Sequence, residues 1–221
     1  MKKVLLTSLN SKYVHSNLAL KYLYMAGKDA CPGLEIREFT INNSRDYIFN
    51  ELVMGDYDAV CFSCYIWNIE KTTELAADLK KAKPQVSILF GGPEVSYDSA
   101  EFMQKHAFLD FLIYGEGEGV FAQWCSALEN GGDMSAIDGL VCRTGDDVTA
   151  GNPQTPVAFG DSAFPYGAFP CEKDKVIYYE ASRGCPFNCS YCISSLDRRI
   201  RELPVERVKS DLSHFLSQNV K

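Results

Sequence analysis

Residues 58–64 read Asp-Ala-Val-Cys-Phe-Ser-Cys, a nearly continuous apolar run. A run without polar alternation is typical of a strand buried on both faces in the centre of a parallel sheet. A helical pattern extends from Asn68 to about Lys83 and ends before Pro84, and a second apolar run covers Val86–Phe90. This alternation of buried strand and helix predicts a parallel α/β sheet.

The same alternation continues on both sides of this segment, over about the first 130 residues. The run Leu34–Ile41 has one wetter face, which favours a position nearer the edge of the sheet. We predict a flavodoxin-like, doubly wound α/β domain over residues 1–132. Its other elements are strands at Val4–Ser8 and Phe111–Tyr114 and helices at about 17–29, 44–54 and 117–130.

The pattern changes after Gly131-Gly132. Two short runs around Gly145-Asp146-Asp147 predict a hairpin, and the aperiodic stretch that follows, rich in Pro, Gly and aromatic residues, predicts a linker. Hairpin and linker together span residues 133–175. A new strand is expected at Val176–Ala181 and a helix at Pro204–Gln218, with Val205, Val208, Leu212, Phe215 and Leu216 facing inward.

The composition is that of a globular protein, with 46% hydrophobic and 23% charged residues among 221. No run is long enough to span a membrane, and the N-terminus has no signal-peptide pattern, so we expect a cytoplasmic protein without a membrane partner. The net charge of −7 gives no direct sign of nucleic-acid binding. Nine cysteines in such a chain indicate metal ligands and core residues rather than disulfides.

Three cysteines lie close together in the segment 180–194, at Cys185, Cys189 and Cys192. Thiolates suit an iron–sulfur cluster or zinc. Three ligands leave one iron of a [4Fe–4S] cluster open, which a substrate-binding cluster requires. The alternative is a zinc site completed by Cys171 or His214, although zinc sites more often use paired Cys-x2-Cys spacings.

The Cys-x3-Cys-x2-Cys segment resembles the start of the radical S-adenosylmethionine family, including the aromatic residue before the third cysteine, Tyr191. The resemblance implies that Cys185, Cys189 and Cys192 bind a [4Fe–4S] cluster. It also implies that S-adenosylmethionine binds the open iron, with Tyr191 near the adenine. Its reductive cleavage then gives a 5′-deoxyadenosyl radical, using electrons from an external donor such as flavodoxin or ferredoxin.

Four loops follow predicted strands of the first domain, at the edge where ligands bind in doubly wound sheets. Their glycines, aromatic residues and small hydroxyls suit close contact with a large ligand. Together, over about Lys2–Asn130, they resemble the cobalamin-binding domain of class B radical S-adenosylmethionine enzymes. The cofactor-binding residues that this implies are Asn10, Tyr13, His15, Ser16, Asn17, Ser63, Cys64, Tyr65, Trp67, Asn68, Gly91, Gly92, Pro93, Glu94, Gly115, Glu116, Gly117 and Glu118.

The first of these loops departs from cobalamin domains that coordinate cobalt through Asp-x-His-x-x-Gly. Here His15 lacks the Asp and the Gly, so we expect base-off cobalamin without a protein histidine ligand. His15 would then hydrogen-bond the corrin or cap the following helix. Cys61 and Cys64 face opposite sides of a strand, so we expect Cys61 in the core and Cys64 lining the loop.

The fold that we predict is therefore a cobalamin-type α/β domain followed by the first β/α unit of a truncated TIM-like radical S-adenosylmethionine barrel. The barrel needs several further strands, so the resemblance implies the N-terminal portion of a longer enzyme, inactive by itself and lacking the residues that select the substrate. The function implied is methyl transfer to an unactivated carbon. Alternatives are a cobalamin-dependent oxidative cyclisation or rearrangement, and a binding module that takes no cobalamin. A methylthiotransferase should carry further cluster cysteines in the first domain.

Overall fold

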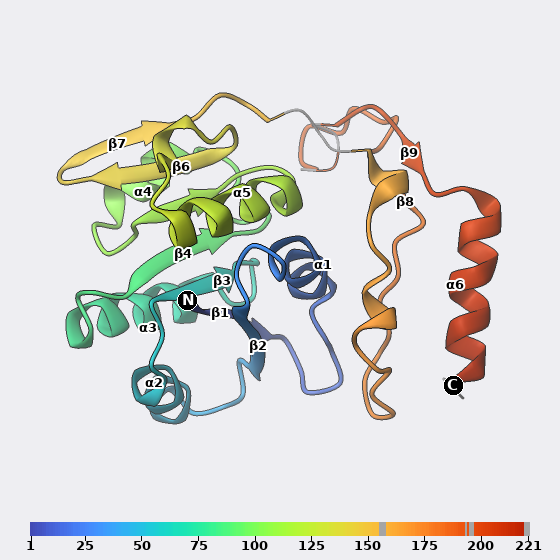
Figure 1. The fold of residues 1–221 in the computed structure, drawn as a ribbon, viewed down its shortest axis with the longest axis horizontal. Coiled ribbons are helices and arrows are strands. Elements are labelled where there is room, and N and C mark those ends of the chain that lie inside the picture. Colours follow the sequence, from blue (N-terminus) through green and yellow to red (C-terminus); the bar gives the residue numbers. More distant parts are fainter. Residues whose placement is uncertain (155–157, 193, 195–196, 219–221) are drawn as a thin grey trace. The chain divides into compact units, whose positions relative to one another are not determined.

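The structure is a computed structural model that describes residues 1–154, 158–192, 194 and 197–218. The chain divides into two compact units, Met1–Thr155 and Pro156–Lys221, which we describe separately. The first unit contains the large sheet in Figure 1 and the second contains helix α6. Within the described residues, no helix has the length and the apolar character to cross a membrane.

The first unit is a doubly wound α/β domain of the flavodoxin type. Its parallel strands lie in the order β2-β1-β3-β4-β5, so the chain reverses its winding direction between β1 and β3. Ligands of such sheets bind beyond the carboxyl ends of the strands at this reversal. The strands are β1 (Lys3–Asn10), β2 (Gly33–Thr40), β3 (Ala59–Ser63), β4 (Ser87–Gly91) and β5 (Phe111–Ile113).

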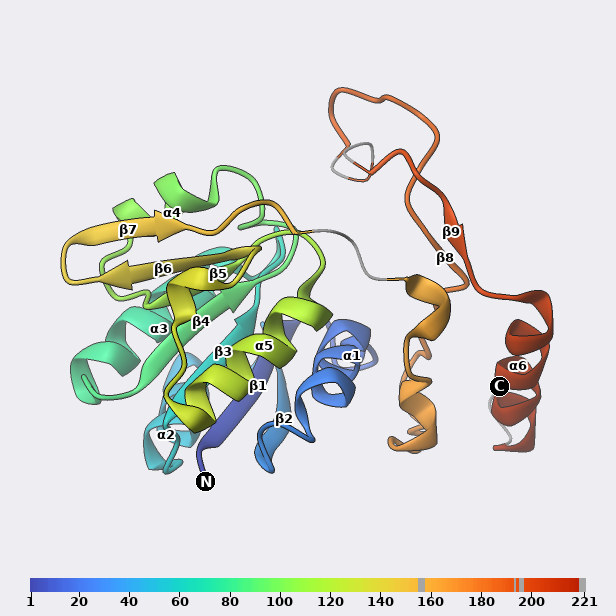
Figure 2. The same ribbon diagram turned by 45° about the horizontal axis from the view of Figure 1, so that its top comes forward.

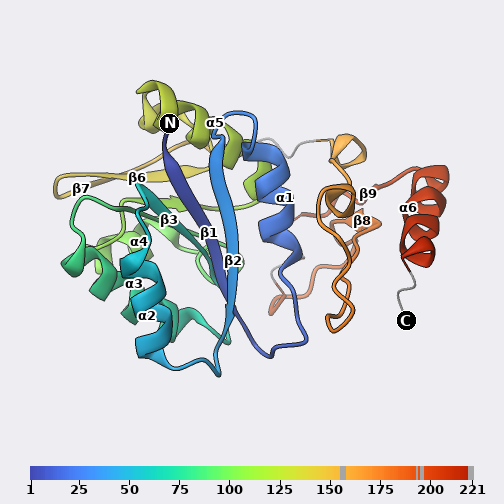
Figure 3. The same cartoon turned by 60° about the horizontal axis from the view of Figure 1, so that its bottom comes forward.

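Helices cover both faces of this sheet, as Figures 2 and 3 show. Helices α1 (Leu18–Gly27) and α5 (Gly117–Asn130) pack on one face. Helices α2 (Arg45–Met54), α3 (Ile69–Ala82) and α4 (Ser99–Lys105) pack on the other. In Figure 3, β1 and β2 run downward to the loops at their carboxyl ends.

Strand β1 illustrates why the sequence forms a central strand. Val4 and Leu6 pack with α1 and α5, whereas Leu5 and Leu9 pack with the core under α2 and α3. All four side chains are completely buried. Alternate residues of a strand face opposite sides, so a strand covered by helices on both sides reads as a continuous apolar run.

The predicted hairpin forms as β6 (Leu140–Thr144) and β7 (Asp147–Ala150), after a short 3-10 helix at Met134–Ala136. It does not stand apart from the first domain. Strand β6 pairs antiparallel with β5, and the hairpin extends the sheet to seven strands. Pairing in this way satisfies backbone groups of β5 that would otherwise form an open edge.

The second unit contains 3-10 turns at Phe159–Asp161 and Pro165–Gly167, two short strands and a helix. The strand predicted at 176–181 is wrong in position and length. Strand β8 covers Ser182–Arg183 and pairs antiparallel with β9 (Arg201–Glu202). A strand needs a neighbouring strand for its backbone hydrogen bonds, and in the described residues β9 is the neighbour that β8 has.

Helix α6 (Val205–Ser217) confirms the predicted helix, but its predicted inward face is only partly right. Phe215 is buried and packs edge-on against the rings of Tyr166 and Tyr179. Asp211 is buried as well. Its carboxylate is not left without partners, since Tyr179 donates a hydrogen bond to it at 2.9 Å and Arg207 forms an ion pair with it. Three residues expected to face inward are exposed: Val205, Leu212 and Leu216.

Candidate cofactor sites

Asn68 lies at the reversal point of the sheet, just before α3, and is only 1% exposed. Its amide nitrogen donates to the carbonyl oxygens of Leu9 and Ser63, both at 3.1 Å, and its oxygen accepts from the backbone N–H of Tyr65 at 2.8 Å. Ser8 adds a hydrogen bond to the same Ser63 carbonyl. The ends of β1 and β3 are therefore held together where the ligand edge begins.

The loop after β1 is held at both of its ends. Asn10 donates from its side-chain nitrogen to the His15 carbonyl at 3.0 Å, and Asn17 caps α1 by accepting from the Leu20 N–H at 3.3 Å. Asn17 rather than His15 is thus the cap of the helix. Glu38, which the sequence interpretation missed, also accepts hydrogen bonds from Asn10 and Asn17.

The loop after β4 lies directly against the start of the loop after β3. Gly92 has φ +110°, and a Cβ there would lie 2.5 Å from the Cys64 carbonyl oxygen. Glycine is required by both the backbone angle and this approach. Ser96 accepts from the Gly115 N–H at 3.3 Å and donates to the Gly92 carbonyl at 2.8 Å, which ties the loops after β4 and β5 together.

The loops at this carboxyl edge of the sheet also expose large apolar side chains to solvent. Trp67 stacks on Tyr65 with ring centroids 4.5 Å apart and is still 46% exposed, and Ile66 between them is 78% exposed. A cluster of exposed apolar groups is typical of a binding surface. We call it the apolar rim, consisting of Tyr13, Val14, Ile66, Trp67 and Tyr97.

The predicted cobalamin residues divide into a supporting layer and a surface layer. The buried ones are Asn10, Ser16, Asn17, Ser63, Cys64 and Asn68. The half-buried ones are His15, Tyr65, Gly91, Gly92, Glu116, Gly117 and Glu118, and the exposed ones are Tyr13, Trp67, Pro93, Glu94 and Gly115. The residues therefore gather at one edge, and the apolar side chains of the surface layer suit the broad faces of a corrin.

Cys64 does not line its loop as the sequence predicted. Its side chain is completely buried in the core that includes Phe62 and Phe90, and burial raises the pKa of its thiol. Cys61 is buried on the opposite face, as expected, and burial likewise raises the pKa of its thiol well above the ordinary value. The chain turns only after Cys64, so the Cys64 thiol still points into the sheet core.

The cysteine loop of the second unit is closed at its neck by Gly184 and Asp197. Gly184 has φ +90°, and a Cβ there would lie 2.1 Å from the Arg199 carbonyl oxygen. The Cys185 N–H donates to the Asp197 carbonyl at 2.9 Å, while Arg201 donates to the Asp197 carboxylate at 2.7 Å. Burial alone would raise the pKa of the Asp197 carboxyl, but the Arg199 N–H and the Arg201 guanidinium both donate to it and hold its pKa below the ordinary value.

In the loop that this neck closes, Cys185, Cys189 and Cys192 are half-buried, and Tyr191 is 90% exposed. Among the residues that the structure describes, no three ligating side chains lie close enough together to hold a metal ion. The donor set nevertheless fits a cluster, because three thiols lie in one short loop with a fixed neck and soft thiolate ligands suit iron–sulfur clusters. The ring of His214, the alternative zinc ligand, packs against Phe164 at 5.2 Å.

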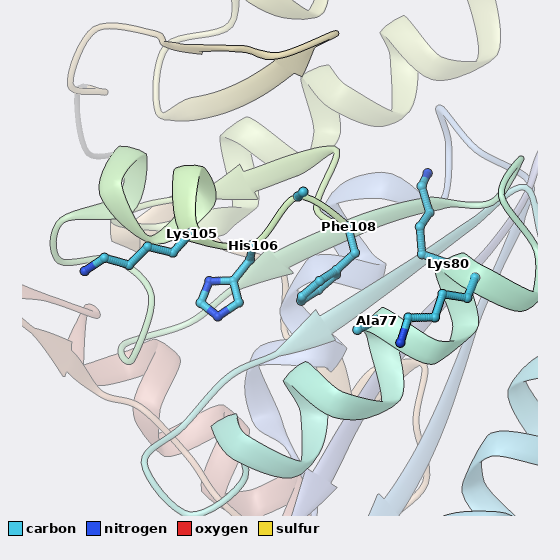
Figure 4. Close-up of a pocket in the computed structure, with 7 residues that line it drawn as sticks. Ala77, Lys80, Lys105, His106 and Phe108 are labelled. Atoms are coloured by element: carbon cyan, nitrogen blue, oxygen red, sulfur yellow. The ribbon is translucent and has the colours of Figure 1, made fainter.

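A separate hollow of about 330 Å³ lies between α3 and the end of α4. Figure 4 shows the rings of His106 and Phe108 there, with Lys80 and Ala77 on α3. Lys80 is paired with Asp110 at 2.8 Å, just before β5. The hollow is therefore near the amino ends of the strands, at the edge opposite the apolar rim.

Comparison with known proteins matches residues 4–124 to the B12 binding domain family. The chain is 28% identical over 177 residues, 74% of its length, to the cobalamin-dependent radical SAM methyltransferase TokK of Streptomyces tokunonensis. It is 30% identical over 122 residues, 52% of its length, to the anaerobic magnesium-protoporphyrin IX monomethyl ester cyclase of a Synechocystis species. The chain spans about a quarter of each of these relatives, 26% and 24%.

Among solved structures, the cobalamin-dependent S-adenosylmethionine radical enzyme OxsB, with aqua-cobalamin bound, has a similar fold. The TM-score is 0.76 at 17% identity, and the match covers 100% of this chain and 33% of that one. At this identity the likeness concerns the fold, and it extends over both units of the chain.

Proposed function

The chain belongs to the B12 binding domain family, and we propose that it is the cobalamin-binding and cluster-bearing part of a cobalamin-dependent radical S-adenosylmethionine enzyme. The observation that carries the proposal is the combination of two features in one chain. One is the apolar rim at the reversal point of the sheet, and the other is the three-cysteine loop closed by Gly184.

The residues of the first unit would hold cobalamin by surface complementarity. The apolar rim would pack on the corrin, and Gly91 and Gly92 would leave room beside it because they carry no side chain. His15 would lie beside the macrocycle without coordinating cobalt. In the second unit, Cys185, Cys189 and Cys192 would hold a [4Fe–4S] cluster.

When bound, the cluster supplies the electron that cleaves S-adenosylmethionine, and cobalamin supplies a transferable methyl group. The reaction that we propose is methyl transfer to an unactivated carbon, and the likeness to a methyltransferase over 74% of the chain supports it. Exposed Tyr191 would contact the adenine of S-adenosylmethionine. A cytoplasmic location and an electron donor such as flavodoxin or ferredoxin stay part of this proposal.

A second candidate is an oxidative cyclisation that uses the same two cofactors. The 30% identity to an anaerobic cyclase over 52% of the chain supports this second candidate. The two reactions differ in their products. Methyl transfer would yield S-adenosylhomocysteine from the S-adenosylmethionine that supplies the methyl group, whereas cyclisation would add no methyl group to the substrate.

The test is anaerobic reconstitution of the protein with iron, sulfide and aquocobalamin, followed by metal analysis and analysis of the S-adenosylmethionine products. We expect about four irons per chain, as a [4Fe–4S] cluster requires, together with bound corrin. Zinc in place of iron, or the absence of any corrin spectral change on titration, would contradict the proposal and favour a binding module without cobalamin.

A further inference from the structure

Glu38 lies where three segments of the first unit meet. It belongs to β2 and is the register partner of Ser8 in β1. One oxygen of its half-buried carboxylate accepts two hydrogen bonds, from the Asn10 side-chain nitrogen at 2.5 Å and from the Asn17 N–H at 2.8 Å. A single acidic side chain of the neighbouring strand therefore holds both ends of the loop after β1.

The chemistry of these bonds suits an ionised carboxylate. Asn10 also donates from the same nitrogen to the His15 carbonyl, so both of its partners are acceptors and the orientation of its amide is fixed. The Asn17 N–H lies at the amino end of α1, where the helix dipole favours a negative charge. Bonds from neutral donors to a charged acceptor are stronger than those between neutral groups.

We propose that Glu38 is a positioning residue for the loop that presents Tyr13 and Val14 to cobalamin. The proposal rests on the proposed function, because it assumes that the apolar rim is the corrin surface. Glu38 does not contact the ligand in this scheme. It fixes the ends of the loop before binding, so that less conformational freedom is lost when the ligand binds.

The experiment compares variants of the whole 221-residue chain by absorbance titration with aquocobalamin and by hydrogen exchange. Glu38→Ala should raise the Kd about tenfold, the equivalent of one strong hydrogen-bonded contact, and should speed exchange within residues 11–17 alone. Glu38→Gln should raise the Kd less than about threefold, because its amide oxygen still accepts both bonds.

The matched control is Glu35→Ala, on the same strand. Glu35 accepts a hydrogen bond from the Tyr57 hydroxyl at 2.5 Å, far from the loop after β1. This variant should lose stability without a change in the Kd or in exchange at residues 11–17. If Glu38→Ala does not fold, Asn10→Ala removes the other half of the side-chain bond and is expected to show the same tenfold loss.

A folded Glu38→Ala chain with the wild-type Kd and wild-type exchange would overturn the inference. So would faster exchange throughout the first unit, because that would mean general destabilisation. If the wild-type chain does not bind aquocobalamin, the proposed function fails instead. The exchange of residues 11–17 then still decides whether Glu38 holds the loop.

Discussion

The edge of the first unit and the cysteine loop of the second both depend on a glycine with positive φ, but they use it differently. Gly92 brings a loop against the Cys64 carbonyl, above a completely buried core. Gly184 closes the neck of a loop against Arg199, and its pairing strands are two residues long. The packed core shapes the first site, whereas in the second site the proposed cluster would bring the three thiols together.

The cysteines of the two units show the same contrast. All five in the first unit are buried: Cys31, Cys61, Cys64, Cys125 and Cys142. The four in the second unit are half-buried: Cys171, Cys185, Cys189 and Cys192. Accessible thiols are available to a metal, and buried ones behave as small apolar residues.

The largest expected effect comes from removing one cluster ligand. Cys185→Ala should reduce iron from about four per chain to nearly none after anaerobic reconstitution, because two thiolates cannot retain the cluster. The measurement is iron and sulfide analysis with the visible absorption spectrum. Cys171→Ala removes a half-buried thiol outside the motif and should keep full iron content. Equal iron in both variants would contradict the assignment of Cys185 as a cluster ligand.

Thiol labelling of the metal-free chain at pH 8 tests the same contrast without a cluster. We expect about four cysteines to react quickly and about five to react only after unfolding, in line with their exposure. Burial raises the pKa of Cys61, Cys64 and Cys125, so these groups stay protonated and unreactive at this pH. Rapid modification of Cys64, identified by mass spectrometry, would contradict its placement in the core.

Gly92→Ala tests the close approach between the loops after β3 and β4. The added Cβ would meet the Cys64 carbonyl at 2.5 Å and would also be strained by φ +110°, so we expect a loss of about 3 kcal/mol in unfolding free energy. Urea denaturation measures it. Gly131→Ala is the control, because its φ of +74° gives strain but its Cβ meets no atom within 4 Å. A loss of about 1 kcal/mol is expected there, and equal losses would contradict the close approach.

The smallest effect on folding is expected at the apolar rim. Ile66→Ser and Met54→Ser change side chains that are 78% and 77% exposed, so each should alter stability by less than about 0.5 kcal/mol. Only Ile66→Ser should weaken aquocobalamin binding, by about fivefold, through lost apolar burial. Absorbance titration of both variants decides it, and an unchanged affinity for Ile66→Ser would remove Ile66 from the corrin surface.

The parts of the fold predicted from sequence are those set by local pattern. Apolar runs located the parallel strands, and the spacing of Cys185, Cys189 and Cys192 located a loop with three thiols. The role of Glu38 depends on the register of β2 against β1, which no local pattern reveals. The docking of the hairpin on β5 was missed for the same reason, because strand pairing between distant segments is a tertiary property.

Helical periodicity had a similar limit in the second unit. It located α6, yet Leu212 and Leu216 are exposed while Asp211 is buried. The position of Asp211 follows from hydrogen bonds with Tyr179 and Arg207, which override the apolar pattern. Likewise, Cys64 was expected to line the loop after its strand, because the end of that strand could be located only to within a residue or two.

The most direct test of the central claim is a count of cobalt and iron in one sample of the chain reconstituted anaerobically with iron, sulfide and aquocobalamin. We expect about one cobalt and about four irons per chain. We also expect cobalt to stay when Cys185→Ala removes the iron, because the residues proposed for the two cofactors lie in separate units. Iron without cobalt, cobalt without iron in the wild-type chain, or zinc in place of iron would contradict it.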